Sequence, residues 1–149
     1  MYEYTKYRLE LVREHCTTSE HHYKISRPDD IHQFLVNICR VHHSPQEVFI
    51  VIALNAKGDV IGYHTVSIGD ISSSIVHPRE VFKYLITCNA SAVILCHNHP
   101  SEDPTPSGED IKVTQRLMSA GELLGISVLD HIIVGNETEY ISLKQEGYI

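Results

Sequence analysis

The chain has 149 residues, a length that fits one domain with a single core and, at most, a short arm. Twelve Lys and Arg against nineteen Asp and Glu give a net charge of −7, which disfavours autonomous nucleic-acid binding because phosphate neutralisation needs basic groups. The sequence has no apolar run of about 18 residues that could span a bilayer, and the polar opening MYEYTKYRLE lacks a signal-peptide core. We therefore expect a cytoplasmic protein without membrane association.

The cysteines and histidines indicate which kinds of chemistry the protein can carry out. The four cysteines have no CxxC spacing, so we expect them to be reduced and mostly buried rather than paired in disulfides. A chain of this size buries roughly 70% of its unfolded surface and needs no metal to fold, so a bound metal would have a chemical role. The eleven histidines are the unusual feature of the composition.

The N-terminal segment is predicted to be an arm over residues 1–24. It should carry an edge strand, because Tyr7, Leu9 and Leu11 alternate with charged residues. Such a strand could pair with a second copy or accept an extended peptide. A helix is predicted over residues 28–40, since an early proline and two acids follow a polar cap and apolar residues then recur at helical spacing.

The middle of the chain predicts a hairpin and a second helix. The run VFIVIAL after Glu47 is too short and too β-branched for a helix, and the turn NAKGD leads from it into a strand over residues 60–67. Pro78 stands where a helix can begin, and the apolar spacing that follows extends that helix to about Asn89.

The last third predicts a central strand, a third helix and two more strands. AVILC at 92–96 is a continuous apolar run, typical of a strand covered on both faces, and it ends in HNHP. A helix is predicted to begin at Ser107, followed by strands over 126–134 and near 140–143. The whole predicts one α/β domain over residues 25–149, a mixed sheet with flanking helices.

A candidate metal site follows from this order. His97 and His99 point the same way because they are two residues apart at the end of a strand. Pro100 and the loop SEDPTP bring the chain back, so that Asp110, in the first turn of the next helix, can reach the same point. Three protein ligands leave a fourth tetrahedral position of zinc open, as in catalytic sites. Alternatively, Ser107 and Asp110 form only a helix-capping box, and HxH is a pair of loop histidines.

HNHP, six residues, then S-x-x-D resembles the JAMM motif of the MPN/JAB metalloprotease superfamily. The wording HNHPSEDPTPS, with VHPREVF upstream and VLDHIIVG downstream, resembles the RadC branch over residues 25–149. The resemblance implies a cytidine-deaminase-like architecture. Members often carry an N-terminal helix-hairpin-helix module, for which this chain has no room; we expect the JAB-type domain alone, which weakens a DNA-repair role inferred from the branch name. Glu102 stands where many relatives have glycine.

The resemblance also implies roles for individual residues. It implies that His97, His99 and Asp110 bind Zn²⁺, that Glu47 is the general base, and that Ser107 donates a hydrogen bond to the bound water or to the developing oxyanion. The expected reaction is hydrolysis of an amide or isopeptide bond in a peptide or protein. Zinc lowers the pKa of its water to about 7, but a carboxylate is still needed to move the proton to the leaving amine.

Two other classes of function stay open. The first is a metal-containing binding module that docks to a DNA repair, replication or mobile-element partner. The second is a nuclease, which the negative charge disfavours. The sequence does not predict the identity of the substrate, the protein partners or the oligomeric state.

The remaining candidate residues have mainly structural interpretations. His131 follows Asp130 in a predicted strand and is either a residue that supports a metal ligand or a core histidine. The pairs His21-His22 and His42-His43 are predicted to be surface histidines, because neighbouring side chains diverge in extended chain. Cys96 is predicted to be a buried thiol that faces away from His97.

Overall fold

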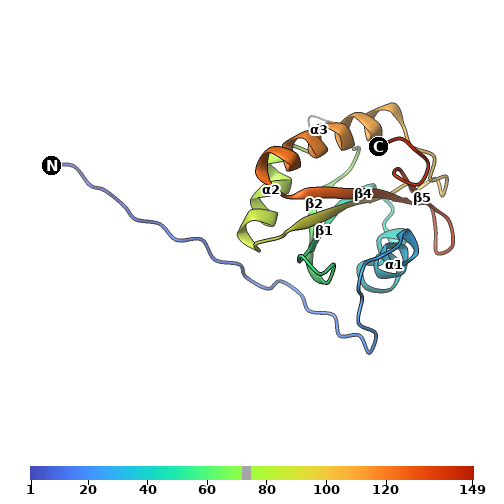
Figure 1. Cartoon of the computed structure of the whole chain (residues 1–149), viewed down its shortest axis with the longest axis horizontal. Coiled ribbons are helices and arrows are strands. Elements are labelled where there is room, and N and C mark those ends of the chain that lie inside the picture. The colour runs from blue at the N-terminus through green and yellow to red at the C-terminus, as the bar shows by residue number, and fades with distance from the viewer. Residues whose placement is uncertain (72–74) are drawn as a thin grey trace.

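The computed structural model describes residues 1–71 and 75–149 and contains one five-stranded sheet. The strands are β1 (Val48–Leu54), β2 (Val60–Ile68), β3 (Ala92–Asn98), β4 (Ser127–Val134) and β5 (Tyr140–Ser142), in the order β2-β1-β3-β4-β5. β3 and β4 are parallel and the other pairs are antiparallel. The predicted α/β class with a mixed sheet is confirmed (Figure 1).

Helices cover both faces of the sheet. The helix α1 (Pro28–Phe34) continues as a π-helical turn, η1 (Leu35–Cys39), and is followed by a 3₁₀ turn, η2 (Val41–His43). The helices α2 (Pro78–Thr87) and α3 (Gly108–Leu124) lie together on the opposite face from α1 (Figure 1). The predicted helix starts at Pro28, Pro78 and Ser107 all fall within one residue of the observed ones.

The alternation of β1 and β3 divides the core into two layers. Phe49, Val51 and Leu95 face α2 and α3, whereas Ile50 and Ile94 face α1. Both strands are therefore buried on both sides, as the continuous apolar run of β3 predicts for that strand. Because β3 is packed on both sides, the side chains at its C-terminal end are held in fixed positions.

The prediction of an edge strand in the N-terminal arm is wrong. Among the described residues, no strand includes any part of residues 1–22, and Tyr7, Leu9 and Leu11 are 85%, 85% and 56% exposed. The arm leaves the body of the domain (Figure 1), so its alternating pattern meets no neighbouring strand to which it could hydrogen-bond. Backbone pairing begins only at an isolated antiparallel bridge between Lys24 and Asp59.

Within the described part of the chain, no helix has the combination of length and apolar character needed to cross a membrane.

Candidate metal centre

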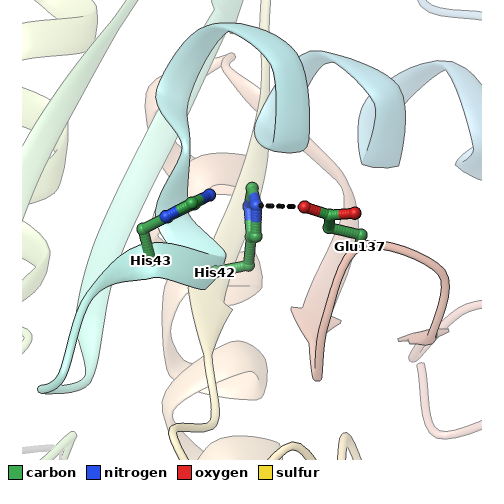
Figure 2. A group of neighbouring side chains, drawn as sticks. All are labelled: His42, His43 and Glu137. Carbon is green, nitrogen blue, oxygen red and sulfur yellow. Dashed lines mark ion pairs between the residues drawn. The ribbon is translucent and has the colours of Figure 1, made fainter.

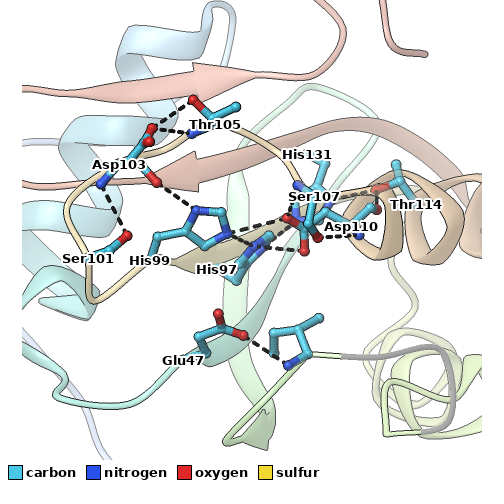
Figure 3. A network of polar contacts seen from close by, with 11 residues as sticks. Glu47, His97, His99, Ser101, Asp103, Thr105, Ser107, Asp110, Thr114 and His131 are labelled. Carbon is cyan, nitrogen blue, oxygen red and sulfur yellow. Dashed lines mark hydrogen bonds and ion pairs between the residues drawn. The ribbon is translucent and has the colours of Figure 1, made fainter.

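The structure brings His97, His99 and Asp110 together at one end of β3 (Figure 3). His97 Nε2 lies 3.0 Å from His99 Nε2 and 3.2 Å from Asp110 Oδ1, and His99 Nε2 lies 3.3 Å from Asp110 Oδ2. The side chain of His97 is fully buried, and those of Asp110 and His99 are 4% and 13% exposed. These three side chains therefore form a compact, mostly desolvated cluster.

The first turn of α3 holds the carboxylate in place through a capping box. Asp110 Oδ2 accepts a hydrogen bond of 2.8 Å from the backbone N–H of Ser107, while Ser107 Oγ accepts one of 3.1 Å from the N–H of Asp110. Asp110 therefore takes part in the helix-capping box and in the cluster with His97 and His99 at the same time. Because Ser107 Oγ acts as an acceptor in the cap, the cap leaves its hydroxyl proton for another partner.

A buried chain of hydrogen bonds fixes the orientation of His97. The Thr114 hydroxyl donates to the backbone carbonyl of Asp110 at 2.6 Å, so its oxygen accepts from His131 Nδ1 at 2.6 Å. His131 Nε2 then has the lone pair and accepts from His97 Nδ1 at 2.7 Å. Assigned from its partners in this way, the neutral His97 ring has its proton on Nδ1 and a lone pair on Nε2.

The same reasoning applies to His99. Its Nδ1 lies 2.7 Å from the carbonyl oxygen of Asp103, which can only accept, so Nδ1 carries the proton. The Nε2 lone pairs of His97 and His99 therefore face each other and the Asp110 carboxylate. Three electron-pair donors with no proton between them repel one another unless a cation lies among them, so the donor set fits a bound metal ion.

When no metal ion is bound, a proton on an Nε2 atom can take the place of the cation among these donors, and the pKa shifts of the cluster reflect this proton-bound form. Burial tends to raise the pKa of Asp110, but the hydrogen bonds with His97 and His99 outweigh burial and hold that pKa well below its usual range. The hydrogen bond with Asp110 raises the pKa of His99. Full burial, together with the neighbouring His97, keeps the pKa of His131 well below its usual range, so this ring stays neutral at physiological pH.

Glu47 stands beside the cluster at the residue before β1 (Figure 3). Its Oε2 accepts a hydrogen bond of 2.9 Å from the backbone N–H of Ile71, and its carbonyl accepts one of 2.8 Å from Gly69. The carboxylate is near enough to His99 to contribute to the raised pKa of that imidazole. The segment after β2 thus orients the side chain of Glu47, which the family resemblance identifies as the general base.

Two side chains that hold the centre together were missed in the sequence. Thr114 completes the chain of hydrogen bonds from His131 to Asp110. The sequence feature that could have indicated this role is its position one helical turn after Asp110. Asn98 lies between the two histidines and points to the other face, where its Oδ1 accepts from Val48 N–H and its Nδ2 donates to the carbonyl of Gln46. Asn98 thereby ties β3 to the segment that carries Glu47; strand alternation would have shown that it faces away from His97 and His99.

The loop from His99 to Ser107 departs from the family pattern at Glu102. This residue has φ 66°, a left-handed conformation that favours glycine, the residue that the family resemblance leads us to expect here. An open groove of about 650 Å³ borders this loop, lined by Ser101, Glu102, Asp103, Pro104, Thr138, Glu139 and Tyr140. None of the three clustered side chains lines the groove.

The other predicted residues have mixed outcomes. Cys96 is fully buried, as expected, but Cys16 is exposed and the other two cysteines are only partly buried. His21, His22 and His43 are exposed, in agreement with prediction. The side chain of His42 is only 9% exposed, because residues 41–43 form η2 rather than extended chain.

Comparison with known proteins finds one matching family and several similar proteins. The sequence model of the RadC-like JAB domain family matches residues 25–148. A UPF0758 protein of Alkaliphilus metalliredigens is 51% identical over 131 residues, which cover 88% of this chain and 55% of that protein. A UPF0758 protein of Bacillus pumilus is 47% identical over 142 residues, which cover 95% of this chain and 62% of that protein.

The chain therefore spans somewhat more than half the length of these relatives. The family match covers all five strands of the sheet and the helices α1, α2 and α3. The resemblance seen in the HNHP and S-x-x-D residues is confirmed: this chain belongs to the RadC-like JAB domain family.

Proposed function

We propose that this chain is a zinc-dependent hydrolase of amide bonds, acting on a peptide or on an isopeptide link. The observation that carries the proposal is the convergence of two imidazole lone pairs and one carboxylate beside Glu47. Membership of the RadC-like JAB family supports a metal-dependent hydrolase. The names of the relatives identify no reaction, so the substrate class rests on chemistry alone.

The donor set suits zinc in number and spacing. Tetrahedral zinc with ligands at about 2.0–2.2 Å separates neighbouring ligand atoms by about 3.3–3.6 Å. The separations of 3.0, 3.2 and 3.3 Å are close to this range. Two nitrogens and one carboxylate oxygen leave one position for water or substrate, as in other catalytic zinc sites.

When bound, Zn²⁺ supplies a Lewis acid that lowers the pKa of a water molecule and polarises the substrate carbonyl. Glu47 accepts a proton from the attacking water and delivers it to the nitrogen of the leaving amine. As the C–N bond breaks, the products are a carboxylate and an amine. The Ser107 hydroxyl donates a hydrogen bond to the developing oxyanion, a contribution of about 2.7–4 kcal/mol at comparable donors.

The test is hydrolysis of a peptide library and of isopeptide-linked substrates by the zinc-loaded chain, with and without a chelator. We expect Glu47→Gln to lower the rate by about 10²- to 10⁴-fold while zinc content stays unchanged, because the variant loses only the proton acceptor. Glu102→Gln, on the exposed loop, is the matched control and should keep its activity.

Two results would contradict the proposal. One is a folded, zinc-loaded chain that cleaves nothing while Glu47→Gln has no cellular phenotype. The other is capture of a protein partner that persists in both Glu47→Gln and His99→Ala without any turnover, which would identify a binding module instead.

A further inference from the structure

A second group of side chains of the types that bind metal ions lies outside the centre described above. His42 and His43 belong to η2, and Glu137 belongs to the turn between β4 and β5, almost a hundred residues later in the chain. Figure 2 shows the His42 ring standing between the other two side chains. One potential ligand atom from each residue lies within 4.8 Å of the others.

The spacing of this group approaches that of a metal site. His42 Nε2 lies 3.5 Å from Glu137 Oε1, which falls within the separation of about 3.3–3.6 Å between neighbouring ligands of tetrahedral zinc. The rings of His42 and His43 have centroids 4.1 Å apart and are inclined by 66°, so they are not stacked face to face. Two nitrogens and a carboxylate oxygen are again a set that zinc binds.

The partly buried ring of His42 has an unsatisfied nitrogen. Its side chain is only 9% exposed, and its Nδ1 is buried with no hydrogen-bond partner. If Nε2 carries the proton and donates to Glu137, a lone pair is left buried on Nδ1. If Nδ1 carries the proton, a buried donor is left unpaired and the Nε2 lone pair faces a carboxylate. Either neutral tautomer is therefore strained by this environment.

Protonation of the ring does not remove the problem. Burial and the neighbouring His43 lower the pKa of His42, against the opposing effect of Glu137, so the ring is neutral at physiological pH. A neutral imidazole is the form that binds a metal ion. In the tautomer with the proton on Nδ1, a divalent cation between Nε2 and the carboxylate would replace the repulsion of two electron-pair donors by two coordinate bonds, although it would not supply a partner for Nδ1.

The two segments that supply these residues are preformed. Val41 is buried in the core and Ser44 N–H donates to its carbonyl, so η2 is anchored to the domain. On the other side, Asn136 Oδ1 accepts from the N–H groups of Thr138 and Glu139, which fixes the turn that carries Glu137. A metal ion here would join two ordered segments rather than order a flexible one.

The group also connects to the first centre through the backbone. The residues after η2 contact Asn98, between the two ligand histidines, and lead directly to Glu47. The turn after β4 adjoins the HNHP segment, because the carbonyl of Val134 accepts from His99 N–H. A cation bound by both segments would therefore brace the segment that carries the general base against the strand beside the ligands.

We propose that His42, His43 and Glu137 form a second divalent metal site, specific for Zn²⁺ or a similar transition metal, that clamps η2 to the turn between β4 and β5. The test is the zinc content of the folded chain after equilibrium dialysis against zinc. The first centre is removed with His99→Ala and Asp110→Asn, so that only ions bound elsewhere are counted. In this background we expect one ion per chain, and we expect its loss with either His43→Gln or Glu137→Gln.

Matched controls are available next to the site. Glu139→Gln changes a carboxylate in the same turn, and His21→Gln changes a histidine of the other adjacent pair; neither should alter the zinc content. His43 and Glu137 are exposed, so their substitutions should leave the fold intact, as circular dichroism would verify. As a second readout, cobalt added to the same background should give visible d–d absorption that Glu137→Gln abolishes.

The proposal is overturned if the background variant binds no zinc, or if its zinc content is unaffected by His43→Gln and Glu137→Gln together. Retention of the ion in both of these variants combined with its loss in His21→Gln would assign it to the N-terminal arm instead. Because the readout is metal content with the first centre removed, the result does not depend on whether the chain is a hydrolase.

Discussion

At the scale of single residues, the candidate centre depends on groups that do not touch the metal position. His97 is oriented by His131, His131 by Thr114, and Thr114 by the backbone of Asp110, which like His97 is a candidate ligand. The chain of hydrogen bonds is buried throughout, so each member has no water to replace a lost partner. Its closure on Asp110 makes the positions of two ligands interdependent.

Thr114→Val should reveal this dependence. The substitution removes the hydroxyl with little change of shape and leaves the Nδ1–H of His131 buried without an acceptor. We expect a decrease of about 1–3 kcal/mol in the free energy of unfolding and a loss of about 10- to 100-fold in zinc affinity. Chemical denaturation and competitive zinc titration measure the two effects.

Thr87→Val is the control for Thr114→Val, because Thr87 makes the same hydroxyl bond to a carbonyl one turn earlier, but on an exposed helix surface. Its zinc affinity should equal that of the wild type. Equal zinc affinities for the two variants would mean that Thr114 has only a structural role.

The residues of the centre differ in how far the sequence predicts them. His97 and His99 follow from strand alternation, and Asp110 follows from its place in the first turn of a helix. Asn98 and Thr114 act through hydrogen bonds to segments distant in sequence or in a neighbouring layer, and one chain contains no periodic signal for such contacts. The low exposure of His42 was not predicted, because a 3₁₀ turn leaves no hydrophobic periodicity over three residues, whereas its neighbour His43 is exposed as predicted.

At the scale of elements, the close approach of α3 to β4 fixes the helix that carries Asp110. Gly121 permits this approach: a Cβ atom there would lie 2.4 Å from the backbone oxygen of Ile126, the residue before β4, and 3.3 Å from the side chain of Val128 in β4. Because a backbone atom cannot move aside as a side chain does, the end of α3 would have to shift.

Gly121→Ala should therefore lower the free energy of unfolding by about 1–3 kcal/mol, the usual effect of overpacking. Gly108→Ala, at the start of the same helix, should leave stability unchanged or raise it by up to about 1 kcal/mol, because nothing lies within 4 Å of its added Cβ. The opposite signs are checked by thermal or urea unfolding. A Gly121→Ala variant as stable as Gly108→Ala would contradict the packing described for α3.

The contact of α1 with β5 should make the stability of the fold depend on pH. His32 is buried, stacks on the Tyr140 ring with centroids 4.5 Å apart, and has Nε2 3.2 Å from the carbonyl oxygen of Asn136. Burial lowers its pKa from the reference value of 6.5, although Asn136 and Asp29 partly oppose the effect. The unfolded chain therefore takes up a proton below pH 6.5 that the folded chain resists, and stability falls as the pH decreases.

His32→Phe keeps the aromatic stack and removes the titrating group. Between neutral pH and about pH 5.5, we expect the wild type to lose more unfolding free energy than this variant does, as measured by urea denaturation at each pH. His64→Phe is the control for the exchange of histidine for phenylalanine, since His64 also stacks on a tyrosine but is exposed, and it measures the effect of that exchange on the unfolding free energy at neutral pH. Parallel pH profiles for the wild type and His32→Phe would refute this account of His32.

The elements themselves are largely predictable because their signals are local. Caps, early prolines and continuous apolar runs mark the helices and the central strands, and the structure follows them. The π-helical turn η1 and the unpaired arm are different, since the first depends on how one turn packs and the second on the absence of a nearby strand edge. Alternation predicts that a segment can form a strand, not that a partner is within reach.

At the scale of the whole molecule, a sheet covered on both faces presents polar side chains at one end of its central strand. The layer with α2 and α3 contains His97, His131 and Phe49, whereas the layer with α1 contains the contacts of Asn98 and leads to η2. The two candidate metal groups are thus supported by opposite layers of the same sheet. The overall α/β arrangement places Glu47, from the start of β1, beside ligands from β3 and α3.

The most direct measurement of the central claim is anomalous scattering at the zinc edge from crystals of the zinc-saturated chain. We predict a peak about 2.0–2.2 Å from His97 Nε2, His99 Nε2 and a carboxylate oxygen of Asp110, and its disappearance in crystals of Asp110→Asn. A folded, zinc-saturated crystal with no peak among these three side chains, or with the side chains turned away from one another, would contradict the claim.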